Sequence, residues 1–404
     1  MVMKEIDIQN FEKRCLKERS KIENSRMSKR NKELILDYDK ICILEALKFA
    51  TRSNILQLLR HFAEDYMSVD FDKASIRDLR EAILKLEEKP YSAYHKQSHK
   101  ATLKKFYKWL YYGDNYKAKL DYPEICSWIN ASIKKKDMKI IKASDLLSEE
   151  EVKKLIDFAG NARDKAIIST LYELGARVSE LGNRLIRDVV RDEYGYIIDL
   201  NGKTGRRSPR IIMSAPYLTA WLNTHPLREN PDSPLWIALS GHTRYQHITY
   251  HTILDMIHTT MKRSGMKKRV YPHLFRHSRA THCLANGWMN EAQCKVYFGW
   301  TPDSAMLSRY AHLTCEDANK AVLRMNGIET GQRKDSVLKT KQCPNCKMIN
   351  EPGAKFCNKC TSILDVKTAT EIDQTRKTAD EKLTLVLTAH PEIVNQIIAL
   401  MSKT

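Results

Sequence analysis

Hydrophobic residues in the first third of the chain recur with the period of an α-helix. In two separate stretches they stand at i, i+3 and i+4, so each stretch forms an apolar stripe with polar residues on its other side. We therefore expect residues 28–132 to be helical, after a highly charged first segment that is either frayed or a helical extension. The two stripes are Ile55, Leu58, Leu59, Phe62 and Phe106, Trp109, Leu110.

A second domain is predicted to begin after a basic linker at residues 133–147. Ser148 and Glu151 match the Ser-x-x-Glu capping box, in which the two side chains satisfy backbone N–H groups at the start of a helix. Helical spacing follows, and it returns later in the chain until Gly327, which is placed to end a helix. We assign residues 148–328 to this domain.

The pattern changes to that of strands between residues 189 and 213, where a glycine-containing loop indicates a β-hairpin. The remainder divides into a polar linker at 329–342, a cysteine-rich module at 343–360, and a further linker with a C-terminal helix at 361–404. The predicted fold class is mainly α with a small antiparallel β-sheet (α+β).

The composition indicates several domains and a polyanionic partner. A chain of 404 residues is too long for one ordinary core. Its net charge of +19 favours nucleic acid, because each lysine or arginine placed against a phosphate releases a condensed counterion. The alternative is a basic surface that binds nothing.

The N-terminus has no apolar core or cleavage site of a signal peptide, and no window reaches the roughly 18 apolar residues of a membrane span. Six cysteines are scattered singly, which is typical of reduced thiols in the cytosol. We therefore expect a cytoplasmic, nucleoid-associated protein without membrane contact.

Five side chains suited to phosphodiester chemistry follow one another in the second half: Arg177, Lys203, His273, Arg276 and Tyr310. A phosphodiester resists attack because its anionic oxygens repel nucleophiles and its leaving alkoxide is poor. The arginine fork grips two phosphate oxygens and keeps its proton, so we assign Arg177 and Arg276 to a clamp. Tyr310 is the candidate nucleophile, His273 its proton acceptor, and Lys203 the general acid for the leaving oxygen.

Each of these residues has an ordinary alternative when taken alone. Arg177 could be a surface charge paired with Glu180, Lys203 a solvated turn residue, His273 a cap, and Tyr310 a packing residue. The order, the spacing and the flanking residues together favour the catalytic interpretation.

The flanking segments at residues 174–181, 273–278 and 309–313 resemble those of the tyrosine recombinase (integrase) family, and residues 299–313 look like archaeal-type integrases. The resemblance implies a helical core-binding domain at 1–132, a catalytic domain at 148–328 and a 3′-phosphotyrosyl intermediate. It also implies double-stranded DNA as substrate, a tetramer on synapsed DNA, and neither ATP nor a catalytic metal.

One position departs from the usual family pattern. Most members have histidine after the glycine at Gly299, whereas this chain has Trp300. An indole N–H can donate to a phosphate oxygen but cannot shuttle a proton. We therefore assign Trp300 as a hydrogen-bond donor and packing residue, with the acid–base work left to His273 and Lys203.

Lysines in the helical domain and the linker are candidates for phosphate contact. Solvated lysines on an ordinary helix are the alternative for any one of them. These candidates are Lys100, Lys104, Lys105, Lys108, Lys134, Lys135 and Lys136.

Four cysteines form two Cys-x-x-Cys pairs: Cys343, Cys346, Cys357 and Cys360. Four thiolates at this spacing suit a closed, tetrahedral, structural Zn²⁺ site, and the module resembles a zinc ribbon. Disulfide pairing is the alternative. DNA or protein contact by the ribbon is open.

These features together predict a site-specific DNA recombinase, and the added ribbon and chain length favour an integrase of a mobile element. An Xer-like recombinase that resolves chromosome dimers and a non-catalytic DNA-binding protein on the same scaffold are the alternatives. An RNA-binding ribbon protein would make the five-residue order a coincidence.

Overall fold

The computed structural model describes residues 6–134, 137, 143–202, 205–304, 319, 322–323, 325–328, 336–389 and 392. The chain forms two compact units. One comprises Gln9–Ile141, and the other comprises Met1–Ile8 together with Lys142–Thr404. Each unit is built around a hydrophobic core of its own.

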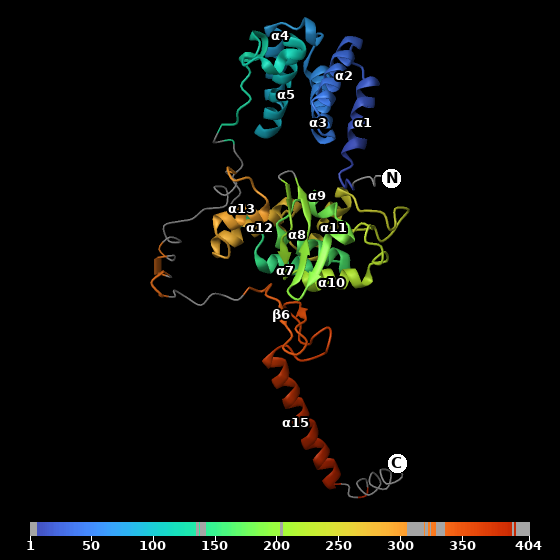
Figure 1. Cartoon of the computed structure of the whole chain (residues 1–404), viewed down its shortest axis with the longest axis vertical. Coiled ribbons are helices and arrows are strands. Elements are labelled where there is room, and N and C mark those ends of the chain that lie inside the picture. Colours follow the sequence, from blue (N-terminus) through green and yellow to red (C-terminus); the bar gives the residue numbers. More distant parts are fainter. Residues whose placement is uncertain are drawn as a thin grey trace. The chain divides into compact units, whose positions relative to one another are not determined.

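The N-terminal unit is helical, as its hydrophobic spacing predicts. Phe106 of the second stripe and Leu59 and Phe62 of the first are fully buried in one core. Ser28, Ser75 and Ser92 begin three of the helices by accepting a backbone N–H with their side chains. The helices, labelled in Figure 1, are α1 (Phe11–Glu23), α2 (Lys29–Leu44), α3 (Phe49–His61), α4 (Ile76–Glu88), α5 (Ala93–Tyr112) and α6 (Glu124–Ser127).

The second unit is organised around one almost completely buried helix, α8 (Ala162–Leu174), against which α7, α10 and α12 pack. Glu173 near its end accepts hydrogen bonds from the backbone N–H groups of Ile212, Met213 and Ser214, at 2.7–2.9 Å. This buried carboxylate therefore fixes the start of α10. The other helices are α7 (Glu149–Asp157), α9 (Val178–Gly182), α10 (Ala215–Thr224), α11 (Tyr250–Arg263), α12 (Pro272–Ala285) and α13 (Glu291–Phe298).

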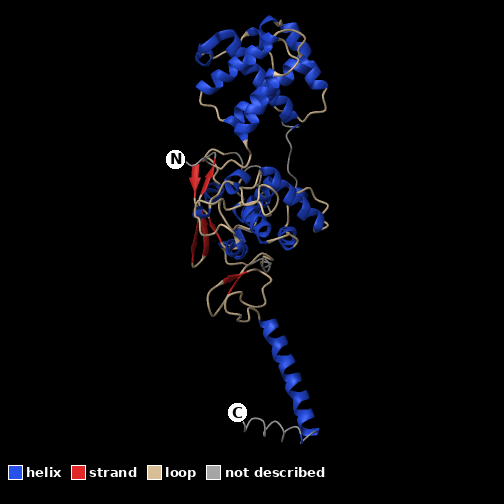
Figure 2. Cartoon of the chain, turned by 90° about the vertical axis from the view of Figure 1, so that its right-hand side faces the viewer, coloured by secondary structure: helices blue, strands red, loops and turns tan. Residues whose placement is uncertain are grey.

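Two small antiparallel sheets lie along one side of these helices (Figure 2). The first has the order β1-β2-β5, in which Val190 pairs with Ile197 and Tyr196 with Ile211. The second pairs β3 with β4, so the predicted hairpin is confirmed but interrupted at Asp199. The strands are β1 (Val189–Asp192), β2 (Gly195–Ile198), β3 (Leu200–Gly202), β4 (Gly205–Arg207) and β5 (Arg210–Ile211). The predicted fold class is confirmed.

The start of the chain contributes to the second unit, which its charged sequence does not indicate. Ile8 is buried in that unit's core, and its amide donates to Asn183 Oδ1 at 3.1 Å. Its carbonyl accepts from the Tyr250 amide at 2.8 Å. A Cβ added to Gly182 would lie 2.3 Å from the Ile8 side chain, so this glycine leaves the space that Ile8 fills.

The C-terminal part contains the two short strands β6 (Lys341–Gln342) and β7 (Ile349–Asn350), followed by α15 (Val366–Ala389). Leu338 packs into the core of the second unit, just before β6. The sequence predicts a linker before the C-terminal helix in residues 361–404, yet the chain is already helical from Val366 to Ala389. Asp365 caps α15 by accepting from the Thr368 amide at 2.9 Å, and the helix buries only Thr368. The predicted C-terminal helix beyond residue 389 lies, apart from Glu392, outside the described residues.

None of the helices within the described ranges combines the length and the apolar character that a membrane span needs.

Candidate active site and metal site

Arg177 lies in the short turn between α8 and α9, where it is the residue before the first turn of α9. Its Nη1 donates to Glu180 Oε1 at 2.6 Å, and its backbone N–H donates to Glu180 Oε2 at 3.2 Å. The Arg177 side chain is 32% exposed, whereas Glu180 is buried. The ordinary Arg-x-x-Glu pairing is therefore present, and it holds a partly accessible guanidinium in a fixed orientation.

Arg276 and His273 project from the first turns of α12, which Pro272 opens. The Arg276 side chain is buried and reaches two backbone carbonyls. Nη1 donates to Gly175 O and Nη2 to Phe298 O, both at 2.8 Å. Since Gly175 is two residues before Arg177, this hydrogen bond brings the two candidate clamp arginines into one neighbourhood.

Gly175 makes this approach sterically feasible. It adopts a left-handed conformation with φ of +50°, which favours glycine. A Cβ at this position would lie 2.5 Å from the Phe298 ring and 3.7 Å from the Arg276 Cα. The glycine in the Leu174–Arg177 segment is thus required both by its backbone conformation and by its neighbours.

Glu180 also binds a second guanidinium, which sequence analysis does not single out. Arg207 Nη2 donates to Glu180 Oε2 at 2.9 Å, and the Arg207 side chain is only 9% exposed. Burial alone would raise the pKa of Glu180, but the charges of Arg207 and Arg177 outweigh it and lower this pKa below its ordinary value. Glu180 is therefore a carboxylate shared by two arginines.

His273 keeps an exposed edge but loses much of its hydration to the surrounding protein atoms. This desolvation, with the positive charges of Arg276 and Arg177, lowers the pKa of His273 below the ordinary histidine value. The imidazole is therefore neutral near pH 7 and able to accept a proton. The His277 ring packs edge-on against it, with the ring centroids 4.4 Å apart.

Trp300 is buried and packs against the clamp. Its ring centroid lies 5.4 Å from the Arg276 guanidinium carbon and 5.1 Å from the Phe298 ring. Trp300 thus packs against Arg276, where an aromatic face stabilises the cation placed over it, and its assignment as a hydrogen-bond donor to phosphate stays a prediction.

Lys203 and Tyr310 lie outside the described residues. Gly202, which precedes Lys203 in the chain, lies directly against the shared carboxylate: a Cβ there would be 2.4 Å from Glu180 Oε1. The β3 strand thus ends beside the Arg177–Glu180 pair.

The candidate DNA-binding lysines of α5 differ in what they contact. Lys100 forms an ion pair with Glu87, Lys104 Nζ donates to Ile129 O at 2.9 Å, and Lys108 Nζ donates to Lys119 O at 2.6 Å. Lys105 is exposed on the same helix. Lys134 is exposed at the end of the unit, and Lys135 and Lys136 lie outside the described residues. Three of the α5 lysines therefore bind within their own unit.

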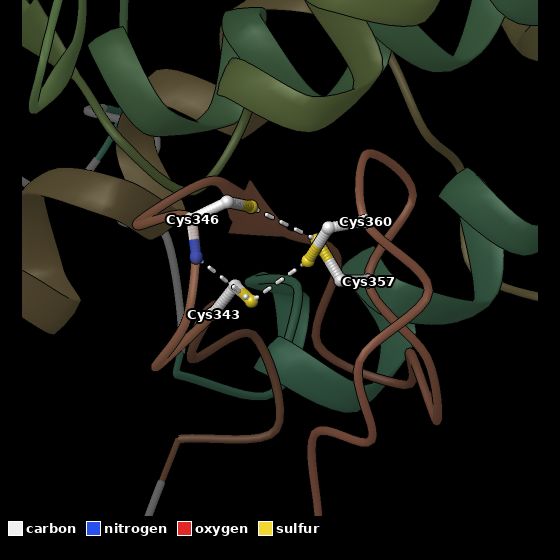
Figure 3. A group of neighbouring side chains, drawn as sticks. All are labelled: Cys343, Cys346, Cys357 and Cys360. Carbon is white, nitrogen blue, oxygen red and sulfur yellow. Dashed lines mark hydrogen bonds between the residues drawn. The ribbon is translucent and has the colours of Figure 1, made fainter.

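The four clustered cysteines point toward one another from two turns of the C-terminal module (Figure 3). The Sγ atoms of Cys343 and Cys360 are 3.5 Å apart, as are those of Cys346 and Cys357. All four sulfurs lie within 4.8 Å of one another. A disulfide needs about 2.05 Å, whereas sulfurs bound at about 2.3 Å around one tetrahedral ion fit the observed spacing.

Hydrogen bonds to the sulfurs also suit thiolate ligands. The Cys346 amide donates to Cys343 Sγ at 3.5 Å, and the Lys359 amide donates to Cys357 Sγ at 3.4 Å. The Ser362 hydroxyl lies 3.2 Å from Cys360 Sγ. The donor set therefore fits a structural metal ion with a sulfur preference.

Comparison with known proteins agrees with this geometry. Residues 145–317 match the phage integrase family. This segment, which is less than half of the chain, is similar to that family of tyrosine recombinases, as the residue order predicts.

Among curated relatives, the tyrosine recombinase XerA of Pyrococcus horikoshii is 35% identical over 141 residues, which cover 35% of this chain and 48% of the relative. The chain thus spans about half the length of such relatives. Two solved structures share the fold. The Tn1549 transposon integrase in complex with circular intermediate DNA is 18% identical, with a TM-score of 0.53 over 72% of this chain and 98% of that chain. A lambda integrase dimer bound to a COC′ core site is 13% identical, with a TM-score of 0.52 over 75% of this chain and 79% of that chain.

Proposed function

We propose that this protein is a site-specific recombinase that breaks and rejoins double-stranded DNA through a 3′-phosphotyrosyl intermediate at Tyr310. The observation that carries the proposal is the junction of Arg276 with the Gly175 carbonyl, two residues before Arg177. It supports the proposal because it joins two segments, distant in the sequence, that carry Arg276 and Arg177.

The proposed reaction follows from the chemistry of the side chains. Arg177 and Arg276 bind the non-bridging oxygens and stabilise the charge that grows on them in the transition state. Tyr310 Oη bonds to phosphorus while neutral His273 accepts its proton, and Lys203 donates a proton to the departing 5′ oxygen. A free 5′ hydroxyl of a second strand reverses these steps and releases the tyrosine, so the bond energy is conserved.

The partners and the biological task are part of the proposal. The net charge of +19 and the exposed Lys105 favour DNA as the partner. We further propose self-association to a tetramer on synapsed DNA and a task in moving a mobile element. The similarity in fold to integrases solved on circular intermediate DNA and on a core site supports this assignment.

We also propose that the four-cysteine module binds one structural Zn²⁺. When bound, the ion would crosslink the two turns and contribute much of the module's folding free energy. The four sulfurs of the cluster would fill all four coordination positions of the ion, so no position would be open for catalysis.

The test is covalent capture on DNA of unknown sequence. Purified protein is incubated with nicked duplexes that are randomised around the nick, so that a cut strand diffuses away and the adduct cannot reverse. Denatured adducts are then isolated and sequenced. We expect the native chain to trap a defined set of sequences and Tyr310→Phe to trap none while still shifting the same duplexes on a native gel. An equal adduct yield from Tyr310→Phe would refute the proposal.

A further inference from the structure

Arg207 is a buried guanidinium that the proposed reaction does not use. It ends β4 on the hairpin that also carries Lys203, and it pairs with Leu200 across the strands. Nη2 donates to Glu180 Oε2 at 2.9 Å. Neither Nε nor Nη1 finds a hydrogen-bond acceptor within the part of the chain that the structure describes, although both are buried.

The Arg207 side chain lies between the shared carboxylate and the junction of α13 with Trp300. A Cβ added to Gly299 would lie 2.7 Å from Arg207 Nη1 and 3.3 Å from its guanidinium carbon. Gly299 adopts a left-handed conformation with φ of +62°, so glycine here serves both the end of α13 and the space for Arg207. Arg207 is thus packed into the same cluster as Arg177, Phe298 and Arg276.

A structural salt bridge does not explain this arrangement. Leaving buried N–H groups unbonded destabilises a protein, and a guanidinium cannot shed its charge to avoid this cost. If Glu180 paired with Arg177 alone, the pair would be close to neutral and would attract a phosphate weakly. A second guanidinium on the same carboxylate gives the three-residue group a net positive charge.

We infer that Arg207 is a positioning residue of the clamp, which shares Glu180 with Arg177 and thereby preserves the positive charge that Arg177 presents to the scissile phosphate. This inference rests on the proposed function. In this arrangement Glu180 orients Arg177, and Arg207 neutralises the negative charge of the Glu180 carboxylate. The contribution of Arg207 is electrostatic, so it should depend on the negative charge of the DNA linkage itself.

The test compares Arg207→Gln with the native chain on two substrates built from the trapped DNA sequence. One has an ordinary phosphodiester at the cleaved position, and the other has an uncharged methylphosphonate there. We expect Arg207→Gln to slow single-turnover cleavage of the phosphodiester on the order of 100-fold and that of the methylphosphonate by less than about tenfold. Arg207→Lys, which keeps the charge, should recover most of the phosphodiester rate.

Arg206→Gln is the matched control, because Arg206 is the preceding residue on β4 but is largely exposed and binds Asp199. Its ratio of phosphodiester to methylphosphonate cleavage should equal that of the native chain. Equal losses on both substrates for Arg207→Gln, with Arg207→Lys no better, would reduce Arg207 to a folding role and overturn the inference. The proposed function would survive that result, since it is tested separately by whether adduct formation depends on Tyr310.

Discussion

Replacing Gly175 with alanine should disrupt the site through backbone geometry alone. The new Cβ would meet the Phe298 ring at 2.5 Å and 2.8 Å, and Phe298 is fully buried, so it has little room to move. A side chain in a left-handed conformation costs about 1–2 kcal/mol. Overpacking of a filled core costs about a further 1–3 kcal/mol.

Gly265→Ala separates these two contributions. Gly265 also has a positive φ, of +66°, but an added Cβ would meet no atom within 4 Å. It should therefore show the conformational cost alone. Because about 1 kcal/mol shifts Tm by roughly 2–4 °C in domains of this size, we expect Gly175→Ala to melt about 2–12 °C below Gly265→Ala.

The same comparison is then made for catalysis. Relief of the clash requires movement of Phe298 or of the α12 backbone that carries Arg276. A misplacement of about 1 Å can cost on the order of 100-fold in rate. We therefore expect covalent adduct formation to fall about 100-fold in Gly175→Ala and to change little in Gly265→Ala, measured well below both melting temperatures. Indistinguishable melting and adduct yields for the two variants would refute the steric reasoning.

Three further expectations follow. The lowered pKa of His273 keeps the imidazole neutral near pH 7, so the cleavage rate should decline only as pH falls below the ordinary histidine value of about 6.5. His273→Gln should lose this acid-side decline in a pH–rate profile, and a decline that begins above pH 7 in the native chain would contradict this assignment. Zinc analysis of the purified chain should give a metal-to-protein ratio near one, and Cys357→Ser should lower this ratio. Cys126→Ser, which changes a buried cysteine outside the cluster, should leave the ratio unchanged, whereas an unchanged ratio in Cys357→Ser would exclude the site. Lys105→Ala should reduce the slope of log DNA affinity against log salt concentration by about 0.9, because Lys105 is exposed and free to contact a phosphate. Lys104→Ala should mainly lower Tm, because Lys104 binds the Ile129 carbonyl, and the reverse pattern would show that Lys104 is the phosphate ligand.

Local sequence signals predict the elements that begin and end through short-range interactions. The capping box at Ser148 and the proline at the start of α12 are both present, because each depends on residues within one helical turn. The β-hairpin is also confirmed, although the sequence pattern does not show its division into two sheets. That division follows from the pairing of β2 with β1 and β5, which depends on packing in the core rather than on local sequence.

Contacts between distant segments are what the sequence could not reveal. Ile8 stands in a charged segment, and nothing near it indicates that it fills a space beside Gly182. Lys104 and Lys108 look like phosphate ligands by composition, yet each binds a carbonyl that a later loop supplies. The sequence gives only a weak indication of the Arg207–Glu180 pair. Glu180 stands three residues after Arg177, at helical spacing, and a buried carboxylate needs a positively charged partner.

Identification of the attacking atom tests the central claim most directly. The trapped adduct can be digested with protease and nuclease, and the DNA-linked peptide can be sequenced by tandem mass spectrometry. We expect a nucleotide joined through its 3′ phosphate to Tyr310, with a free 5′ hydroxyl on the other DNA end. A linkage to any other side chain, or a phosphate left on the 5′ end, would contradict the mechanism.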